Sequence, residues 1–317
     1  RQTRPHDWRR PASYGASEQM NSVSHCDTPL LRVAYLDGGP QDGAPVILLH
    51  GWPDDATTYA RISPMLHEAG FRTFSPWLRG FGPTSFLSKE TMRSGEIAAM
   101  AQDVLDFADA LGISRFAVVG HDWGARISYL LASVFPDRIK CCAALSLGWQ
   151  PGKPATPTPE QAKAFWYQWF MATARGAEFV RKNGKEFARY QWDSWGPLGW
   201  FDDAIFDGVA SSFENPDWAD VTLHSYRVRW EEAEPDPRYA ELARRQATVK
   251  IITVPILTLH GGDDRVVFAQ SSEGLEEHFT AFYRRVVLDG IGHFPTREAS
   301  DQVSRMLAAF LDSHGKR

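Results

Sequence analysis

The chain has 317 residues, of which 43% are hydrophobic and 23% are charged, values close to the average of globular proteins. This composition excludes a disordered chain, a collagen and a coiled coil, and the length suffices for one large domain or two modest ones. Thirty-four basic against 39 acidic residues give a net charge of −5 without a long basic run. A nucleic-acid partner is therefore not expected, and a small-molecule ligand is favoured.

Residues 1–24 are predicted to form an irregular tail. They hold no signal peptide, because Arg9 and Arg10 are followed by a polar stretch rather than an apolar core. The cysteines Cys26, Cys141 and Cys142 form no metal-binding or disulfide pattern, so we expect reduced, buried thiols in a cytoplasmic protein. Apolar runs are too short for a membrane span.

Strands and helices alternate along most of the remaining sequence. Strands are predicted at residues 31–36, 46–49, 71–76, 116–120, 139–147, 254–260 and 283–288, and helices at about 56–69, 96–111, 125–135, 271–278 and 298–310. Several of these strands are apolar on both faces, which is typical of a sheet covered on both sides. The pattern predicts an α/β fold with a mostly parallel central sheet flanked by helices.

Residues 149–230 interrupt this pattern. Here the strand signals stop, and Trp, Tyr and Phe cluster at helical spacing between Pro and Gly breaks. We expect an inserted helical cap at 149–230, between two core segments at 25–148 and 231–317. The high aromatic content predicts an aromatic-lined cavity.

The segment Gly120-His121-Asp122-Trp123-Gly124 follows a buried strand and leads into a helix. A sharp turn of this kind needs small flanking residues, and it raises the central side chain at the carboxyl edge of the sheet. Asp122 is therefore the predicted nucleophile, although an aspartate here could also simply cap the helix.

Two other turns complete a catalytic set. His50-Gly51-Trp52-Pro53 follows another buried strand, and the backbone N–H groups of Trp52 and Trp123 are the predicted oxyanion-hole donors. After residues 254–259, Gly-x-x-Asp spacing favours Asp264 over Asp263 as the acid that orients a histidine. His293 lies on a glycine loop before the last helix and is the predicted general base.

The order Asp122, Asp264, His293 resembles the α/β-hydrolase fold superfamily. The Asp-Trp pair at the turn resembles epoxide hydrolases and haloalkane dehalogenases within it. Tyr167, followed by Gln, and Tyr226, followed by Arg, are similar to the two cap tyrosines with which epoxide hydrolases hold and protonate the epoxide oxygen. Trp166, Trp169 and Phe294 are predicted to line the substrate pocket.

The resemblance implies an epoxide hydrolase that converts a small apolar epoxide and water into a diol through an Asp122 ester, without cofactor or metal. The alternative is a haloalkane dehalogenase in which Trp123 and a cap tryptophan hold the halide. Trp52, where dehalogenases have Asn or Glu, counts against it. Arg126 is similar to a carboxylate-binding arginine of fluoroacetate dehalogenases, but Trp123 replaces the second arginine, so a carboxylate substrate is not expected.

A non-catalytic binding protein with the same fold is a more remote alternative, because every element of the catalytic set is present. The chain has no Gly-x-Ser-x-Gly sequence, so serine esterase chemistry has no candidate nucleophile. It also has no His-Glu-x-x-His or Cys/His cluster, so the sequence implies no metal site. The oligomeric state is not predictable from these features.

Overall fold

The computed structural model describes residues 23–316. Nine strands in this part of the chain form one sheet in the order β1-β2-β4-β3-β6-β7-β8-β9, with β5 beside β2. The strands are β1 (Val23–Asp27), β2 (Leu31–Gly38), β3 (Ala44–Leu49), β4 (Phe71–Pro76), β5 (Ser85–Phe86), β6 (Phe116–His121), β7 (Ile139–Leu145), β8 (Ile256–Gly261) and β9 (Tyr283–Leu288). The neighbours from β4 to β9 are parallel, whereas β2 is antiparallel to β1, β4 and β5. The predicted α/β fold is therefore confirmed.

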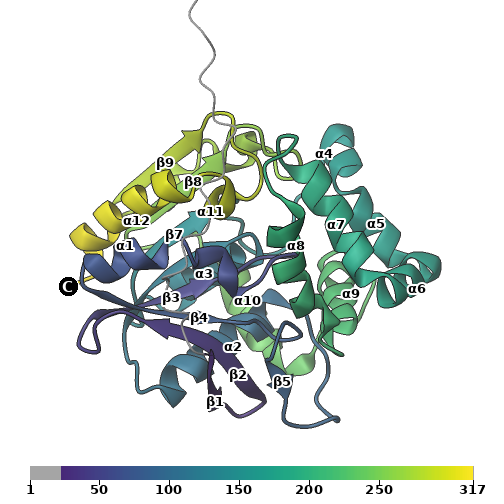
Figure 1. Ribbon diagram of the computed structural model, residues 1–317, viewed down its shortest axis with the longest axis horizontal. Helices are drawn as coiled ribbons and strands as arrows, with labels where there is room; N and C mark the ends of the chain where they lie inside the picture. The colour runs from purple at the N-terminus through teal and green to yellow at the C-terminus, as the bar shows by residue number, and fades with distance from the viewer. Residues whose placement is uncertain (1–22, 317) are drawn as a thin grey trace, which may run out of the picture.

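Helices cover both faces of the sheet (Figure 1). On one face α1 (Ser63–Glu68) packs against α12 (Ser300–His314), and on the other α2 (Ile97–Ala110) packs against α3 (Trp123–Val134). Successive side chains of a strand point to opposite faces, so Val118 and Val119 of β6 enter two different hydrophobic cores. Both valines are fully buried, which explains the unbroken apolar sequence of this strand.

Six helices form a separate layer beside the sheet, between β7 and β8 in the chain (Figure 1). They are α4 (Pro159–Ala164), α5 (Trp166–Ala172), α6 (Ala174–Lys182), α7 (Gly184–Trp195), α8 (Asp203–Ala210) and α9 (Trp218–Arg229). All six lie within the predicted cap, whereas the next helix, α10 (Ala240–Thr248), packs against α3. No helix of residues 23–316 is long and apolar enough to cross a membrane.

Some predicted elements differ from the structure. The helix predicted at 271–278 is wrong: two short 3₁₀ turns, Ala269–Ser272 and Glu276–His278, stand there instead. Gly274 between them has φ +68°, a left-handed conformation that interrupts a helix. The predicted tail lies mostly outside the described residues, and its last two residues belong to β1.

The first and the last predicted helices also differ from the structure in their limits. The helix predicted at 56–69 is split into a 3₁₀ turn, Ala56–Tyr59, and α1, which has a proline in its first turn. Proline lacks the N–H that would continue a preceding helix, so it favours a new start. The closing helix begins earlier than predicted, with the short α11 (Pro295–Glu298) before α12.

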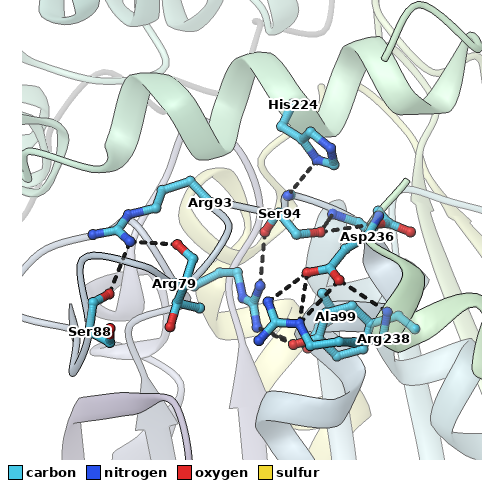
Figure 2. A network of polar contacts seen from close by, with 12 residues as sticks. Arg79, Ser88, Arg93, Ser94, Ala99, His224, Asp236 and Arg238 are labelled. Carbon is cyan, nitrogen blue, oxygen red and sulfur yellow. Dashed lines mark hydrogen bonds and ion pairs between the residues drawn. The ribbon is translucent and has the colours of Figure 1, made fainter. Parts of the chain in front are cut away.

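Arg79, shortly after β4, is the centre of a buried polar network (Figure 2). Its guanidinium group donates to both carboxylate oxygens of Asp103 on α2, at 2.6 and 2.7 Å, and to the backbone carbonyl of Ser94 at 3.0 Å. The next residue, Gly95, donates its N–H to Nδ1 of His224 on α9 at 2.9 Å. The network therefore connects the loop before α2 to both a core helix and a cap helix.

We expect Asp103→Ala to lower the free energy of unfolding by about 3 to 5 kcal/mol, because it leaves the fully buried Arg79 guanidinium without its counter-charge. Urea unfolding followed by circular dichroism measures the change. The matched control is Asp109→Ala on the same helix, whose ion pair with Arg138 is solvent exposed and should contribute less than about 1 kcal/mol. Equal effects of the two substitutions would contradict the prediction.

Candidate active site

Asp122 lies in the turn between β6 and α3 with φ 52° and ψ −112°, an unfavourable conformation for a residue with a side chain. The glycines on either side leave room for this turn. A Cβ atom on Gly120 would lie 2.0 Å from the carbonyl oxygen of Gly124, and one on Gly124 would lie 2.1 Å from that of Leu49. The backbone therefore fixes the Asp122 side chain at the carboxyl edge of the sheet.

The Asp122 carboxylate has a partner on each oxygen. Oδ1 accepts a hydrogen bond from the backbone N–H of Trp52 at 2.9 Å, and Oδ2 lies 3.5 Å from Nε2 of His293. Burial disfavours the charged form, but His293 and the Trp52 amide outweigh it and lower the pKa of Asp122 below its ordinary value. Trp123 begins α3, where backbone N–H groups have no partner within the helix. Asp122 is thus an ionised side chain that accepts one backbone hydrogen bond and directly precedes the first turn of α3.

His293 lies between two carboxylates. Its Nδ1 is 2.7 Å from Oδ2 of Asp264, and Oδ1 of Asp264 accepts from the backbone N–H groups of Val266 and Val267 at 2.9 Å each. Burial opposes the charged imidazole, but Asp264 and Asp122 outweigh it and raise the pKa of His293 well above its ordinary value. Asp263 is exposed. The structure thus connects Asp122, His293 and Asp264 through consecutive side-chain contacts. Asp264, and not Asp263, is the acid that contacts the histidine.

Two cap tyrosines lie close to Asp122, on the same cavity. Tyr167 from α5 and Tyr226 from α9 have ring centroids 5.3 Å apart and rings nearly perpendicular. The hydroxyl of Tyr167 accepts from Nε2 of Gln168 at 2.8 Å, and that of Tyr226 accepts from Nε1 of Trp123 at 3.2 Å. Burial, reinforced by the negative charge of Asp122, raises the pKa of both tyrosines. Both hydroxyls are therefore neutral, and each already accepts one hydrogen bond.

A family model described as the α/β hydrolase fold matches residues 44–298. The chain belongs to this family. A structure from Klebsiella pneumoniae, provisionally described as an epoxide hydrolase, is 35% identical with a TM-score of 0.87, over 92% of this chain and 97% of that one. Epoxide hydrolase A of Mycobacterium tuberculosis is 27% identical over 90% of this chain and 95% of its own. A haloalkane dehalogenase of Psychrobacter cryohalolentis is 39% identical, over 36% of this chain and 37% of its own.

Beside Asp122 this α/β hydrolase encloses a cavity of about 590 Å³. Asp122, Trp123, Tyr167 and Tyr226 all line it, as do Phe165 and Gln168. The volume is that of a pocket for a small organic molecule. Within residues 23–316, no group of three or more His, Cys, Asp or Glu side chains is placed to hold a metal ion.

The three aromatic residues predicted to line the pocket do not line this cavity. Trp166 is 37% exposed, and the indole of Trp169 donates to the backbone carbonyl of Ala162 at 2.9 Å. Phe294 is fully buried against the ring of Trp200, at a centroid distance of 4.7 Å. On α5 successive side chains point about 100° apart, so Tyr167 and Gln168 face inward while their aromatic neighbours face outward.

Sequence patterns did not reveal how Tyr167 is held in this hydrolase. Nε1 of Trp230, at the end of α9, donates to Oε1 of Gln168 at 2.7 Å. This bond fixes the orientation of the Gln168 amide, so that its NH₂ group points to the Tyr167 hydroxyl. Gln168 could be found from its place beside Tyr167, but Trp230 has no signal in the sequence, because the contact depends on the packing of α5 against α9.

Proposed function

We propose that this α/β hydrolase is an epoxide hydrolase that forms a vicinal diol through a covalent ester on Asp122. The observation that supports this best is the tyrosine pair. Tyr167 and Tyr226 are neutral, line the same cavity as Asp122, and each accept a hydrogen bond from a neighbour. The Tyr226 O–H also donates to Tyr167, and a bound epoxide oxygen would replace Tyr167 as its acceptor. An epoxide needs such donors, because its opening produces an alkoxide, whereas a departing halide does not.

In the first step, Oδ2 of Asp122 attacks an epoxide carbon from the side opposite the ring oxygen. The carbon–oxygen bond breaks, and the developing alkoxide takes a proton from one tyrosine hydroxyl while the other donates a hydrogen bond. The product of this step is a hydroxyalkyl ester of Asp122.

In the second step, His293 removes a proton from a water molecule, which attacks the ester carbonyl carbon of Asp122. The backbone N–H groups of Trp52 and Trp123 hold the resulting oxyanion. Collapse releases the diol and restores the Asp122 carboxylate, and His293 keeps the proton taken from water, as in the free protein. The sum is one epoxide and one water converted into one diol.

The charge of Asp122 explains why His293 acts only in the second step. In the free protein the two carboxylates favour the protonated imidazole. Formation of the ester removes the charge of Asp122 and leaves Asp264 as the only carboxylate at His293, so the pKa of His293 falls. The imidazole then passes its proton to the tyrosinate left by ring opening. The neutral ring can accept a proton from water when the ester is hydrolysed.

Haloalkane dehalogenation is the second candidate, because a dehalogenase is among the relatives and Trp123 stands beside the nucleophile. A halide cradle requires the indole N–H of Trp123. This N–H donates to the Tyr226 hydroxyl at 3.2 Å, so it is already engaged. We therefore place dehalogenation second.

Diol formation from styrene oxide, with halide release from 1-bromobutane measured in parallel, tests the proposal. We expect diol and no halide from the unmodified protein. Tyr167→Phe combined with Tyr226→Phe should lower kcat/KM for styrene oxide by about 10² to 10⁴, the usual contribution of a general acid. Tyr190→Phe, a change at a 57% exposed cap tyrosine, is the matched control. Release of halide without diol, unaffected by the double substitution, would reject the proposal.

A further inference from the structure

The cavity beside Asp122 contains two arginine side chains that the proposed reaction does not use. Arg126 lies in the first turns of α3, four residues after the nucleophile, and Arg229 is the last residue of α9 in the cap. Both line the cavity together with Tyr167 and Tyr226. The fold thus brings one guanidinium group from the sheet side and one from the cap to the same space.

Neither arginine has a directly contacting carboxylate in the part of the chain that the structure describes, although the charge of Asp122 is near both. Their side chains make no hydrogen bond or ion pair with any of these residues, and Nε of Arg229 is buried without a partner. The guanidinium group of Arg229 packs over the ring of Trp230, 5.4 Å from its centroid. Both side chains are half-buried, and buried cationic nitrogens are normally paired. The unpartnered Nε of Arg229, with a second guanidinium group in the same cavity, indicates that a bound molecule supplies acceptors.

The acidic residues that line the same cavity are otherwise engaged. Glu231 forms an ion pair with Lys153, and a carboxylate oxygen of Glu96 accepts from the backbone N–H of Asp236 at 2.5 Å. Glu234 is exposed to solvent, and Asp122 faces His293. None of these carboxylates forms an ion pair with Arg126 or Arg229, and only the more distant charge of Asp122 offsets their positive charge.

The two arginines also affect each other. Burial, together with the nearby charge of Arg126, lowers the pKa of Arg229 to about 9, while burial lowers that of Arg126. Both remain charged at neutral pH, and their repulsion is unfavourable until an anion binds between them. A carboxylate fits this demand, because its two oxygens match the paired N–H groups of a guanidinium.

We propose that the substrate is an epoxide that carries a carboxylate group, held by Arg126 and Arg229 while Asp122 and the tyrosines act on the ring. This inference rests on the proposed function and narrows its substrate class. It differs from the apolar substrate predicted from the sequence, because Arg229 provides a second guanidinium group beside Arg126. The sequence does not show that the end of α9 lies at the cavity, so it could not predict a role for Arg229.

Matched acid and amide epoxides test the inference, because they have nearly the same shape and differ in charge. The two pairs are 3-phenylglycidate with 3-phenylglycidamide, and 4-carboxystyrene oxide with 4-carbamoylstyrene oxide. We expect kcat/KM for at least one acid to exceed that for its amide by about 10- to 100-fold. Arg229→Met and Arg126→Met should each lower this preference at least tenfold, and Arg229→Lys should retain part of it. Arg181→Met, at a half-exposed cap arginine paired with Asp220, is the control and should leave the preference unchanged.

Calorimetric binding of the unreactive 3-phenylpropanoate and 3-phenylpropanamide gives a readout that does not depend on turnover. We expect the acid to bind more tightly than the amide, and Arg229→Met to abolish the difference in a variant whose melting temperature shows that it is folded. Equal turnover and equal binding of acid and amide would overturn the anionic substrate but leave the epoxide hydrolase proposal intact. If no epoxide gives a diol, the proposed function fails, and the calorimetry still decides whether the arginines form an anion site.

Discussion

Asp122→Ala is expected to reduce diol formation from styrene oxide by about 10⁵-fold or more, to the rate without protein. The substitution removes the carboxylate proposed to attack the epoxide carbon, and with it the ester on which the second step depends. The remaining oxyanion-hole donors and tyrosines have no bound intermediate to stabilise. Chromatographic measurement of the diol over many hours is sensitive enough to detect a decrease in rate of about 10⁵-fold.

The control for this substitution is Asp263→Ala, because Asp263 is an exposed aspartate on the turn that holds Asp264. It should keep the unmodified rate. Asp122→Ala should also remain folded, because removal of the side chain leaves the glycine-flanked turn in place, and circular dichroism checks this. Steady-state diol from the folded Asp122→Ala variant would show that water attacks the epoxide directly and that Asp122 is not the nucleophile.

The turn around Asp122 could be predicted because its physical requirements are local. Gly120 and Gly124 stand where a side chain would meet backbone atoms within about 2 Å, and a buried strand precedes them. Asp264 and His293 follow β8 and β9, and parallel strands bring their carboxyl ends to one edge of the sheet. The position of each residue directly after a predicted parallel strand, together with the glycine spacing, was therefore enough to predict that these three side chains lie close together.

The lining of the cavity could not be predicted in the same way. It depends on the rotation of each cap helix about its own axis, and a shift of one residue moves a side chain by about 100°. Trp166 and Trp169 flank Tyr167 and Gln168 in the sequence, yet only the latter two reach the cavity. The proximity of Arg126 and Arg229 is still harder to predict. The two residues lie on α3 and α9, which come together only when the cap packs onto the core.

His293→Gln should separate the two steps that the charge argument distinguishes. Without the base, Asp122 can still open the epoxide, because the attack needs only the carboxylate and the two tyrosines. Hydrolysis of the ester should slow by about 10⁴-fold, since the substitution removes the imidazole that takes a proton from water. We expect consumption of one equivalent of styrene oxide followed by almost no turnover.

Mass spectrometry of the His293→Gln variant should then show an increase of one substrate mass, located on the peptide that contains Asp122. The control is His25→Gln, at an exposed histidine of β1, which should turn over normally and carry no adduct. A His293→Gln variant that is folded and inactive without any adduct would mean that His293 is already needed for ring opening. In that case its protonated form, favoured by Asp122 and Asp264 in the free protein, would have to act as the acid in place of the tyrosines.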